Sequence, residues 1–141
     1  MKRSILLAGI LFLLACAHAT STFEECAAAH DAIPMCTVVA KANLYDGREV
    51  TVRLHHQDTP HYGLIYAPEC RIFAQPAFAD RVEGDRQFKA ALRRSPISSA
   101  EVVVRAVFHR AKPEEVFGPA GAPYKFAIEA CFCARSDPRR D

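Results

Sequence analysis

The N-terminus constrains this chain most, because it has the charge and hydropathy pattern of an export signal. Lys2 and Arg3 precede an apolar run of 12 residues, from Ser4 to Ala15. Such a run is too short to cross a bilayer and matches the apolar core of a secretory signal peptide. We therefore expect the chain to fold outside the cytoplasm, where disulfide bonds form and persist.

The end of the apolar run, Leu13–Cys16, resembles the lipobox of bacterial lipoproteins, in which the cysteine is lipidated and becomes the first mature residue. The resemblance implies a signal peptide at 1–15, lipidation of Cys16 and a lipid membrane as a partner. Because Ala17 follows instead of Asp, it also implies an outer-membrane protein facing the periplasm. The alternative is cleavage after Ala19, a small-x-small site, which would give a soluble periplasmic or secreted protein beginning at Thr20.

Cysteine pairing is the next constraint. The chain has six cysteines: Cys16, Cys26, Cys36, Cys70, Cys131 and Cys133. With Cys16 lipidated or removed, the other five predict two disulfides and one free thiol. We expect Cys36–Cys70, and Cys26 bonded to either Cys131 or Cys133. On a regular strand Cys131 and Cys133 share one face, and a bond between them would be strained.

Length and charge indicate one domain and exclude one class of partner. A chain of 141 residues suits a single core. We expect a tether at 16–22, one domain at 23–135 and a charged, flexible tail at 136–141. Loss of Lys2 and Arg3 leaves 16 basic residues against 16 acidic ones, so the mature chain is near neutral. We therefore expect no nucleic-acid partner.

Alternating apolar and polar residues predict strands, and capping signals predict helices. The five expected strands are Glu49–His55, Gly63–Ala67, Arg71–Ala74, Glu101–Arg110 and Tyr124–Cys133. Thr22 and Glu25 form a capping-box pattern ahead of a helix from Phe23 to about Ala32. A short helix is expected from about Cys36 to Asn43, and another near the end of 80–95, before Pro96.

These elements predict a mainly β protein with minor helices. Five strands, an N-terminal helix and a helix between the third and fourth strands favour a small five-stranded barrel of the OB type. Closure of the sheet would remove exposed strand edges.

A resemblance supports the same fold. Tyr45–Arg53 resembles a recurring opening in small, uncharacterised bacterial envelope proteins with an OB-like barrel, and the stretches Val102–Phe108 and Phe117–Ile128 are similar to the second half of that pattern. Leu54 and Ala106 stand where such proteins usually have Gly. The resemblance implies a fold and a compartment, with no known activity.

A narrower resemblance implies an enzyme. Val52–Leu54 followed by Asp58–Pro60 resembles the signature of staphylococcal-type thermonucleases, in which a strand Arg stabilises phosphate and an Asp five residues later binds calcium. Arg53 and Asp58 have that spacing. His61 stands where the general-base Glu would be, and Arg48 interrupts the run that would supply a second calcium carboxylate. A metal-dependent nuclease or phosphodiesterase is therefore one alternative function.

A histidine cluster gives a second alternative. His55, His56 and His61 lie within seven residues, with Asp58 among them. Imidazole suits zinc, copper or nickel, so these four residues are candidate ligands of a periplasmic metal-binding protein. Adjacent strand residues point to opposite faces, so His55 and His56 can share an ion only across a bulge.

The favoured function is a non-catalytic, exported and lipid-anchored envelope protein without a cofactor. Its expected partner is an envelope protein, a glycan or a small ligand. An exposed aromatic patch around Tyr62, Tyr66 and Phe73 is one candidate contact surface. A basic helix face can contact anionic lipid, although a solvated surface is the plainer reading. Its residues are Arg86, Lys89, Arg93 and Arg94.

Overall fold

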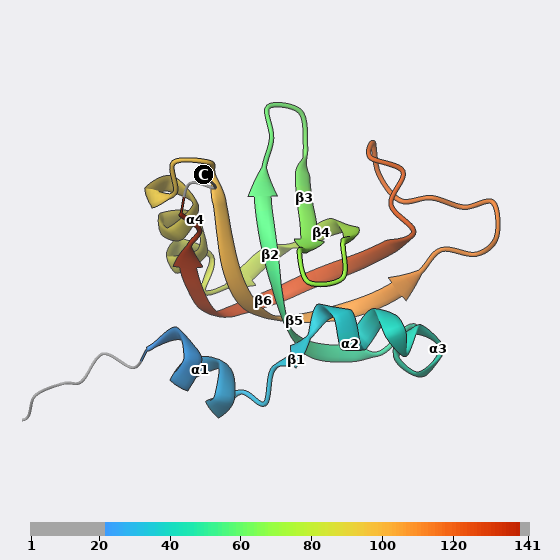
Figure 1. Ribbon diagram of the computed structural model, residues 1–141, viewed down its shortest axis with the longest axis horizontal. Coiled ribbons are helices and arrows are strands. Elements are labelled where there is room, and N and C mark those ends of the chain that lie inside the picture. Colours follow the sequence, from blue (N-terminus) through green and yellow to red (C-terminus); the bar gives the residue numbers. More distant parts are fainter. Residues whose placement is uncertain (1–21, 139–141) are drawn as a thin grey trace, which may run out of the picture.

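A computed structural model describes residues 22–138 and has a mainly β fold with a few short helices (Figure 1). The strands are β1 (Ile33–Pro34), β2 (Glu49–Asp58), β3 (Gly63–Ala67), β4 (Ile72–Glu83), β5 (Ser99–Arg110) and β6 (Tyr124–Ser136). The helices are α1 (Phe23–Ala29), α2 (Met35–Ala40), α3 (Ala42–Tyr45) and α4 (Asp85–Arg94). The predicted signal peptide, Cys16, the tether up to residue 21 and the last three tail residues lie outside the described residues.

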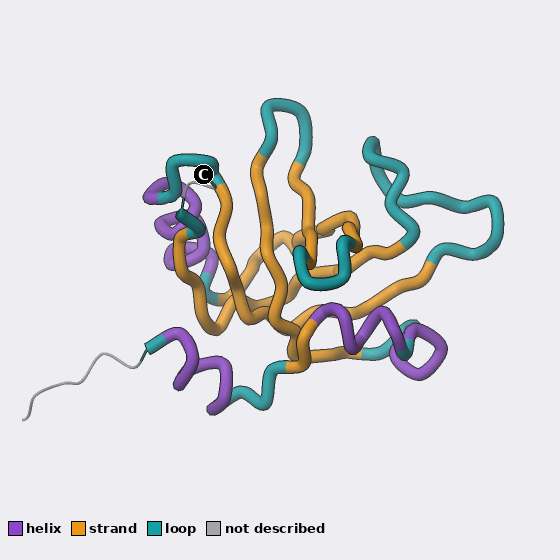
Figure 2. Tube along the Cα trace, viewed as in Figure 1, coloured by secondary structure: helices purple, strands orange, loops and turns teal. Residues whose placement is uncertain are grey.

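The six strands form one mixed sheet in the order β1-β2-β3-β4-β6-β5. An additional pairing of β2 with β5 brings five strands, β2, β3, β4, β6 and β5, into a near-ring. Within this near-ring β4 and β6 run parallel, and the other pairs are antiparallel. Figure 2 shows the strands at the centre of the molecule and the helices at its periphery.

All five predicted strands are present, and α4 lies between the third and fourth of them as expected. The largest difference is β4, which continues from the predicted end at Ala74 to Glu83. The part of β4 after Ala74 lacks a strand-like alternation of apolar residues and contains Pro76. It is a strand because Gln75–Phe78 pair with β6, a contact that is distant in sequence.

The first two predicted helices are present with changed bounds. The capping box between Thr22 and Glu25 is formed, and α1 ends at Ala29 instead of the predicted Ala32. Asp31 adopts a left-handed φ of 51°, which prevents the helix from continuing. The predicted second helix is divided into α2 and α3 at Lys41, whose ψ of 37° is not helical.

The main core fills the inside of the near-ring. Val50, Val52 and Leu54 of β2 point inward and are buried, as the alternation predicts. The largest side chains in this core include Phe108 and Phe126, whose ring centroids are 5.2 Å apart. A smaller cluster lies where α1 packs on β5 and β6, and it consists of Phe23, Cys26, Ala27, Ala32, Val103, Phe132 and Cys133.

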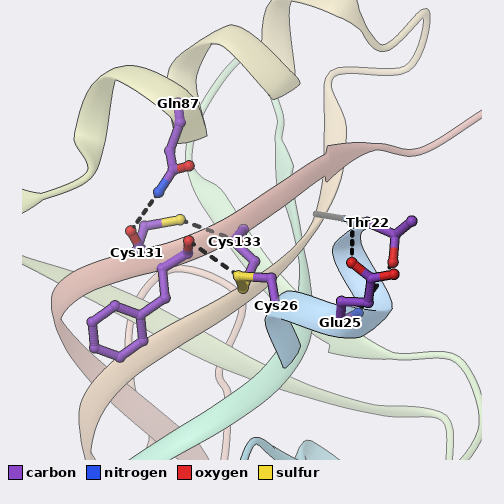
Figure 3. The surroundings of a disulfide bond; sticks show 7 residues. Thr22, Glu25, Cys26, Gln87, Cys131 and Cys133 are labelled. Carbon is purple, nitrogen blue, oxygen red and sulfur yellow. Dashed lines mark hydrogen bonds between the residues drawn. A yellow bond between two sulfur atoms is a disulfide. The ribbon is translucent and has the colours of Figure 1, made fainter. Parts of the chain in front are cut away.

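Two disulfide bonds are formed, Cys36–Cys70 and Cys26–Cys133, and Cys131 is a buried free thiol. Both pairings, and the one free thiol among the five cysteines of the described residues, confirm the prediction. Figure 3 shows Cys26 on α1 reaching Cys133 on β6, with Cys131 nearby and Gln87 above it on α4. Burial raises the pKa of the Cys131 thiol to about 12, which keeps it protonated and a poor nucleophile.

The expectation that Cys131 and Cys133 share one face was wrong. Val103 pairs with Cys133 and Val104 with Cys131, so the register shifts by one residue at this point. A bulge of this kind reverses the alternation of side chains along a strand. Cys131 therefore packs in the main core and Cys133 in the cluster under α1, within reach of Cys26.

The disulfides indicate an oxidising compartment outside the cytoplasm. Across residues 22–138, no helix has the length and apolar character needed to span a bilayer.

Candidate ligand-binding cavity

A cavity of about 600 Å³ lies between β4 and α4. It exists because β4 leaves its partner strand: pairing with β6 stops after Phe78 and resumes at Glu83, so residues 79–82 bulge away from the sheet. The lining residues come from β2, β4 and α4. They are His56, Asp58, Phe78, Ala79, Asp80, Arg81, Val82, Asp85, Phe88, Lys89 and Leu92.

A buried imidazole forms part of the wall. His56 is 1% exposed, and its Nε2 lies 2.8 Å from Oδ1 of Asp58. Burial lowers the pKa of His56 and outweighs the opposing effect of Asp58, so the ring is neutral at pH 7. A carboxylate only accepts hydrogen bonds, so Nε2 carries the proton and donates it to Asp58. Nδ1 is then an acceptor, and no described residue donates to it.

Aromatic rings surround this imidazole. Phe78 and Phe88 contact His56 edge-on, with centroid distances of 5.7 and 5.0 Å. The two phenyl rings lie 5.8 Å apart. Phe78 is 46% exposed although it is large and apolar, whereas Phe88 is buried. The cavity therefore combines an aromatic wall with a buried acceptor, a combination typical of small-molecule sites.

Charges of both signs line the rim. Lys89 and Asp85, one turn apart on α4, form an ion pair at 2.6 Å. Asp80 and Arg81 on β4 form no side-chain ion pair or hydrogen bond with any residue in the described range. Two charged groups at the cavity are thus available to a ligand.

The opposite face of β2 has a different character. The Arg53 guanidinium donates to both carboxylate oxygens of Glu24 at 2.7 Å and to Glu101 at 2.6 Å. Arg135 donates to the other oxygen of Glu101 at 2.7 Å. The Phe23 ring lies 5.1 Å from the Arg53 guanidinium and 4.6 Å from that of Arg135. Hydrogen bonds with Glu24 and Glu101 raise the pKa of Arg53, and the bond from Arg53 lowers the pKa of Glu24.

The nuclease pair is not brought together. Arg53 belongs to the ion-pair network under α1, whereas Asp58 lines the cavity beside His56. The odd-numbered Arg53 and the even-numbered Asp58 leave β2 on opposite faces, since a strand alternates at every residue. Arg53 is therefore committed to carboxylates, and Asp58 has no guanidinium from β2 beside it.

The histidines are also separated. His55 binds Asp137 through Nδ1 at 2.9 Å, His56 binds Asp58, and His61 lies exposed in the β2–β3 connection. In the stretch from Thr22 to Pro138, no three His, Cys, Asp or Glu side chains converge in a way that could hold a metal ion. The candidate ligands His55, His56, Asp58 and His61 thus do not form one site here.

A hydrogen-bond network that sequence reasoning missed holds the end of β6. Asp137 Oδ2 accepts from Ser99 at 2.6 Å and from Tyr66 at 3.4 Å, besides its bond to His55. Burial works to raise the pKa of Asp137, but the hydrogen bonds from His55 and Ser99 together lower it. β6 continues through Ser136, so the first two residues of the expected tail are part of the fold.

The other predicted surfaces are partly assembled. Phe73 is 38% exposed and pairs in register with Tyr66, which stacks on His55. Tyr62 is half-buried in the β2–β3 connection. The basic side chains of α4 are exposed, and one of them, Lys89, lies at the cavity and is already paired with Asp85.

Sequence reasoning named His56 and Asp58 but missed Phe78, Asp80 and Arg81. These three lie in the half of β4 that lacks a periodic pattern, so no local signal placed them beside α4. The helix expected near the end of 80–95 is α4, and its buried Phe88 and Leu92 line the cavity.

Comparison of the chain with protein-family models, with curated proteins and with solved structures finds no match.

Proposed function

We propose that this protein is an exported, non-catalytic binding module built on an OB-like barrel, and that it binds a small ligand in the β4–α4 cavity. The cavity carries the proposal. Its volume of about 600 Å³ lies within the range of small-molecule sites. Its wall contains an aromatic pair and a buried imidazole nitrogen that receives no hydrogen bond from residues 22–138.

The strand order supports the OB-like interpretation. Counted without the two-residue β1, the five strands pair in the order first-second-third-fifth-fourth, and the fourth returns to the first. The third and fifth strands are parallel, and a helix connects the third to the fourth. The sequence predicted that helix position for an OB-type barrel.

Binding is favoured over catalysis because the one resemblance to an enzyme depended on Arg53 and Asp58. Arg53 is saturated by Glu24 and Glu101 on the α1 side of the sheet. A phosphate would have to displace two carboxylates to reach it, and the hydrogen bonds that it would break are charge-assisted. Asp58 is instead positioned by His56 as a wall of the cavity.

A screen against the cavity tests the binding proposal. A mixed set of neutral, cationic and anionic aromatic fragments should shift the amide resonances of residues 78–89 in a two-dimensional NMR spectrum. Ala79→Trp fills the cavity mouth and should abolish these shifts. Val116→Trp adds the same bulk at a 66%-exposed loop position that does not line the cavity, and it should leave them unchanged. If no fragment class perturbs the cavity, the binding proposal is wrong.

We further propose that Cys16 is lipidated and anchors the protein to the outer membrane on its periplasmic side. Mass spectrometry of the purified protein should show an acyl addition that Cys16→Ser abolishes, and the variant should leave the membrane fraction. A wild-type protein that is soluble and begins at Thr20 would overturn this proposal and favour plain secretion.

A further inference from the structure

The charge at the cavity favours a positive ligand. Three carboxylates, from Asp58, Asp80 and Asp85, face two cations, Arg81 and Lys89. Asp85 and Lys89 neutralise each other, and His56 is neutral. Asp58 therefore keeps a full negative charge, and Asp80 adds a second. With Arg81 opposing them, the rim is negative by about one charge.

Asp58 is preorganised as an acceptor. The hydrogen bond from His56 fixes its Oδ1, while no described residue donates to its Oδ2. The His56 ring cannot rotate freely, because it is buried and contacts both Phe78 and Phe88. An acceptor that is already oriented loses little entropy when a ligand binds.

The aromatic wall favours the same charge. The faces of phenyl rings carry partial negative charge and attract ammonium groups, and they also cover the apolar part of a ligand. Phe78 supplies such a ring with nearly half of its surface exposed. Val82 and Leu92 extend the apolar lining beside it.

We propose that the β4–α4 cavity binds a small organic ammonium ion, with Asp58 and Asp80 as its acceptors and Phe78 and Phe88 as its apolar wall. This inference rests on the proposed binding function and names the chemistry of its ligand. His56 acts as a positioning residue through Asp58. Its Nδ1 is buried, with less than 1 Å² exposed.

Three matched probes test the charge of the ligand: benzylammonium, benzyl alcohol and benzoate, titrated separately at pH 7 and followed by the amide shifts of residues 78–89. Benzylammonium should bind at least about tenfold more tightly than benzyl alcohol, because its hydrogen bonds to carboxylates are charge-assisted. Benzoate should bind most weakly. Tighter binding of benzoate, or equal binding of the alcohol, would overturn the ammonium assignment and leave the binding function standing.

Charge variants sharpen the test. Asp80→Asn and Asp58→Asn should each weaken benzylammonium binding by at least about tenfold, the lower end of what one charge-assisted hydrogen bond contributes. Glu83→Gln makes the same charge change on β4 at a residue that does not line the cavity, and it should leave affinity within about twofold.

Arg81→Gln distinguishes a positively charged ligand from a negatively charged one. It removes a cation from the rim, so it should tighten benzylammonium binding and weaken any binding of benzoate. If Arg81→Gln weakens benzylammonium binding, or if Asp80→Asn and Glu83→Gln behave alike, the proposed acceptors are wrong. If no probe shifts the cavity resonances, the binding function itself fails, which is a separate result.

Discussion

Two regions of the molecule meet on β2, and they differ in how fully their polar side chains are paired. On the α1 side, Arg53 uses three of its nitrogens on Glu24 and Glu101, and a disulfide ties α1 to β6. On the cavity side, His56 leaves one ring nitrogen without a partner, and Asp80 and Arg81 are unpaired within the described chain. Arg53 and His56 are three residues apart in the same strand.

The difference separates architecture from function. A saturated network at the α1 side adds stability and has no capacity left for a ligand. An unsatisfied buried acceptor costs about 1–3 kcal/mol in a folded protein, so it persists where something other than stability maintains it. We therefore infer that the α1 side stabilises the fold and that the cavity binds the ligand.

The largest expected effect is loss of the disulfide on the α1 side. In the chain-entropy model, the Cys26–Cys133 bond closes a span of 107 residues, and its removal in Cys26→Ala/Cys133→Ala should lower the free energy of unfolding by about 5 kcal/mol. The matched variant Cys36→Ala/Cys70→Ala opens a span of 34 residues and should cost about 4 kcal/mol. Urea denaturation measures both. An α1-side variant as stable as wild type would show that the Cys26–Cys133 bond does not reinforce the fold.

The second effect concerns the carboxylate at the centre of the ion-pair network. Glu101→Ala should lower the free energy of unfolding by about 2 kcal/mol, because Arg53 and Arg135 lose their buried shared acceptor and keep only the exposed Glu24. Glu49→Ala removes an exposed carboxylate that lies 3.9 Å from Arg105, so a change of at most about 0.5 kcal/mol is expected there. If Glu101→Ala and Glu49→Ala lower the free energy of unfolding equally, the buried network stabilises the fold no more than an exposed ion pair does.

The sequence predicted the strands and helices that have a local signal, such as alternating apolar residues or a capping box. The alternation in β2 and β5 predicted both strands and their inward faces, and the capping box predicted α1. The part of β4 after Ala74 forms a strand because it pairs with the parallel strand β6. This pairing is distant in sequence, so no local pattern predicts it.

The sequence identified two residues of the candidate site but not the cavity that they line. The sequence named His56 and Asp58 as candidate metal ligands, and the two side chains are in direct contact. Their grouping with His55 and His61 was not realised, because alternation along β2 sends His55 to Asp137. Phe78 and Asp80 depend on the departure of β4 from β6, which is a tertiary event.

A smaller effect comes from crowding the imidazole. A Cβ added at Gly63 would lie 2.8 Å from Cε1 of His56, closer than side chains pack, and that ring is confined by two phenyl rings. Gly63→Ala should therefore lower the free energy of unfolding by about 1–2 kcal/mol and shift the His56 ring signals. Ala67→Gly, near the other end of β3, changes flexibility without crowding His56 and should leave those signals in place. Unchanged His56 signals in Gly63→Ala would mean that the ring has room to move.

The smallest effect is the pH dependence of stability, and it distinguishes the two regions directly. The pKa of His56 is lowered by burial from the ordinary value of 6.5, so the unfolded chain takes up this proton more readily than the folded one. Stability from the neutral ring is full above pH 6.5 and is lost as pH falls through the folded pKa, with a slope of at most about 1.4 kcal/mol per pH unit for one proton. Glu24→Gln should keep the wild-type slope between pH 7 and pH 5, because the pKa of Glu24 lies below 4.5. His56→Phe should reduce the slope, and NMR titration of the wild-type ring gives the same pKa if that variant does not fold. A His56 pKa at or above 6.5 would mean that burial does not outweigh the effect of Asp58, and the cavity would then lose the neutral imidazole that positions Asp58.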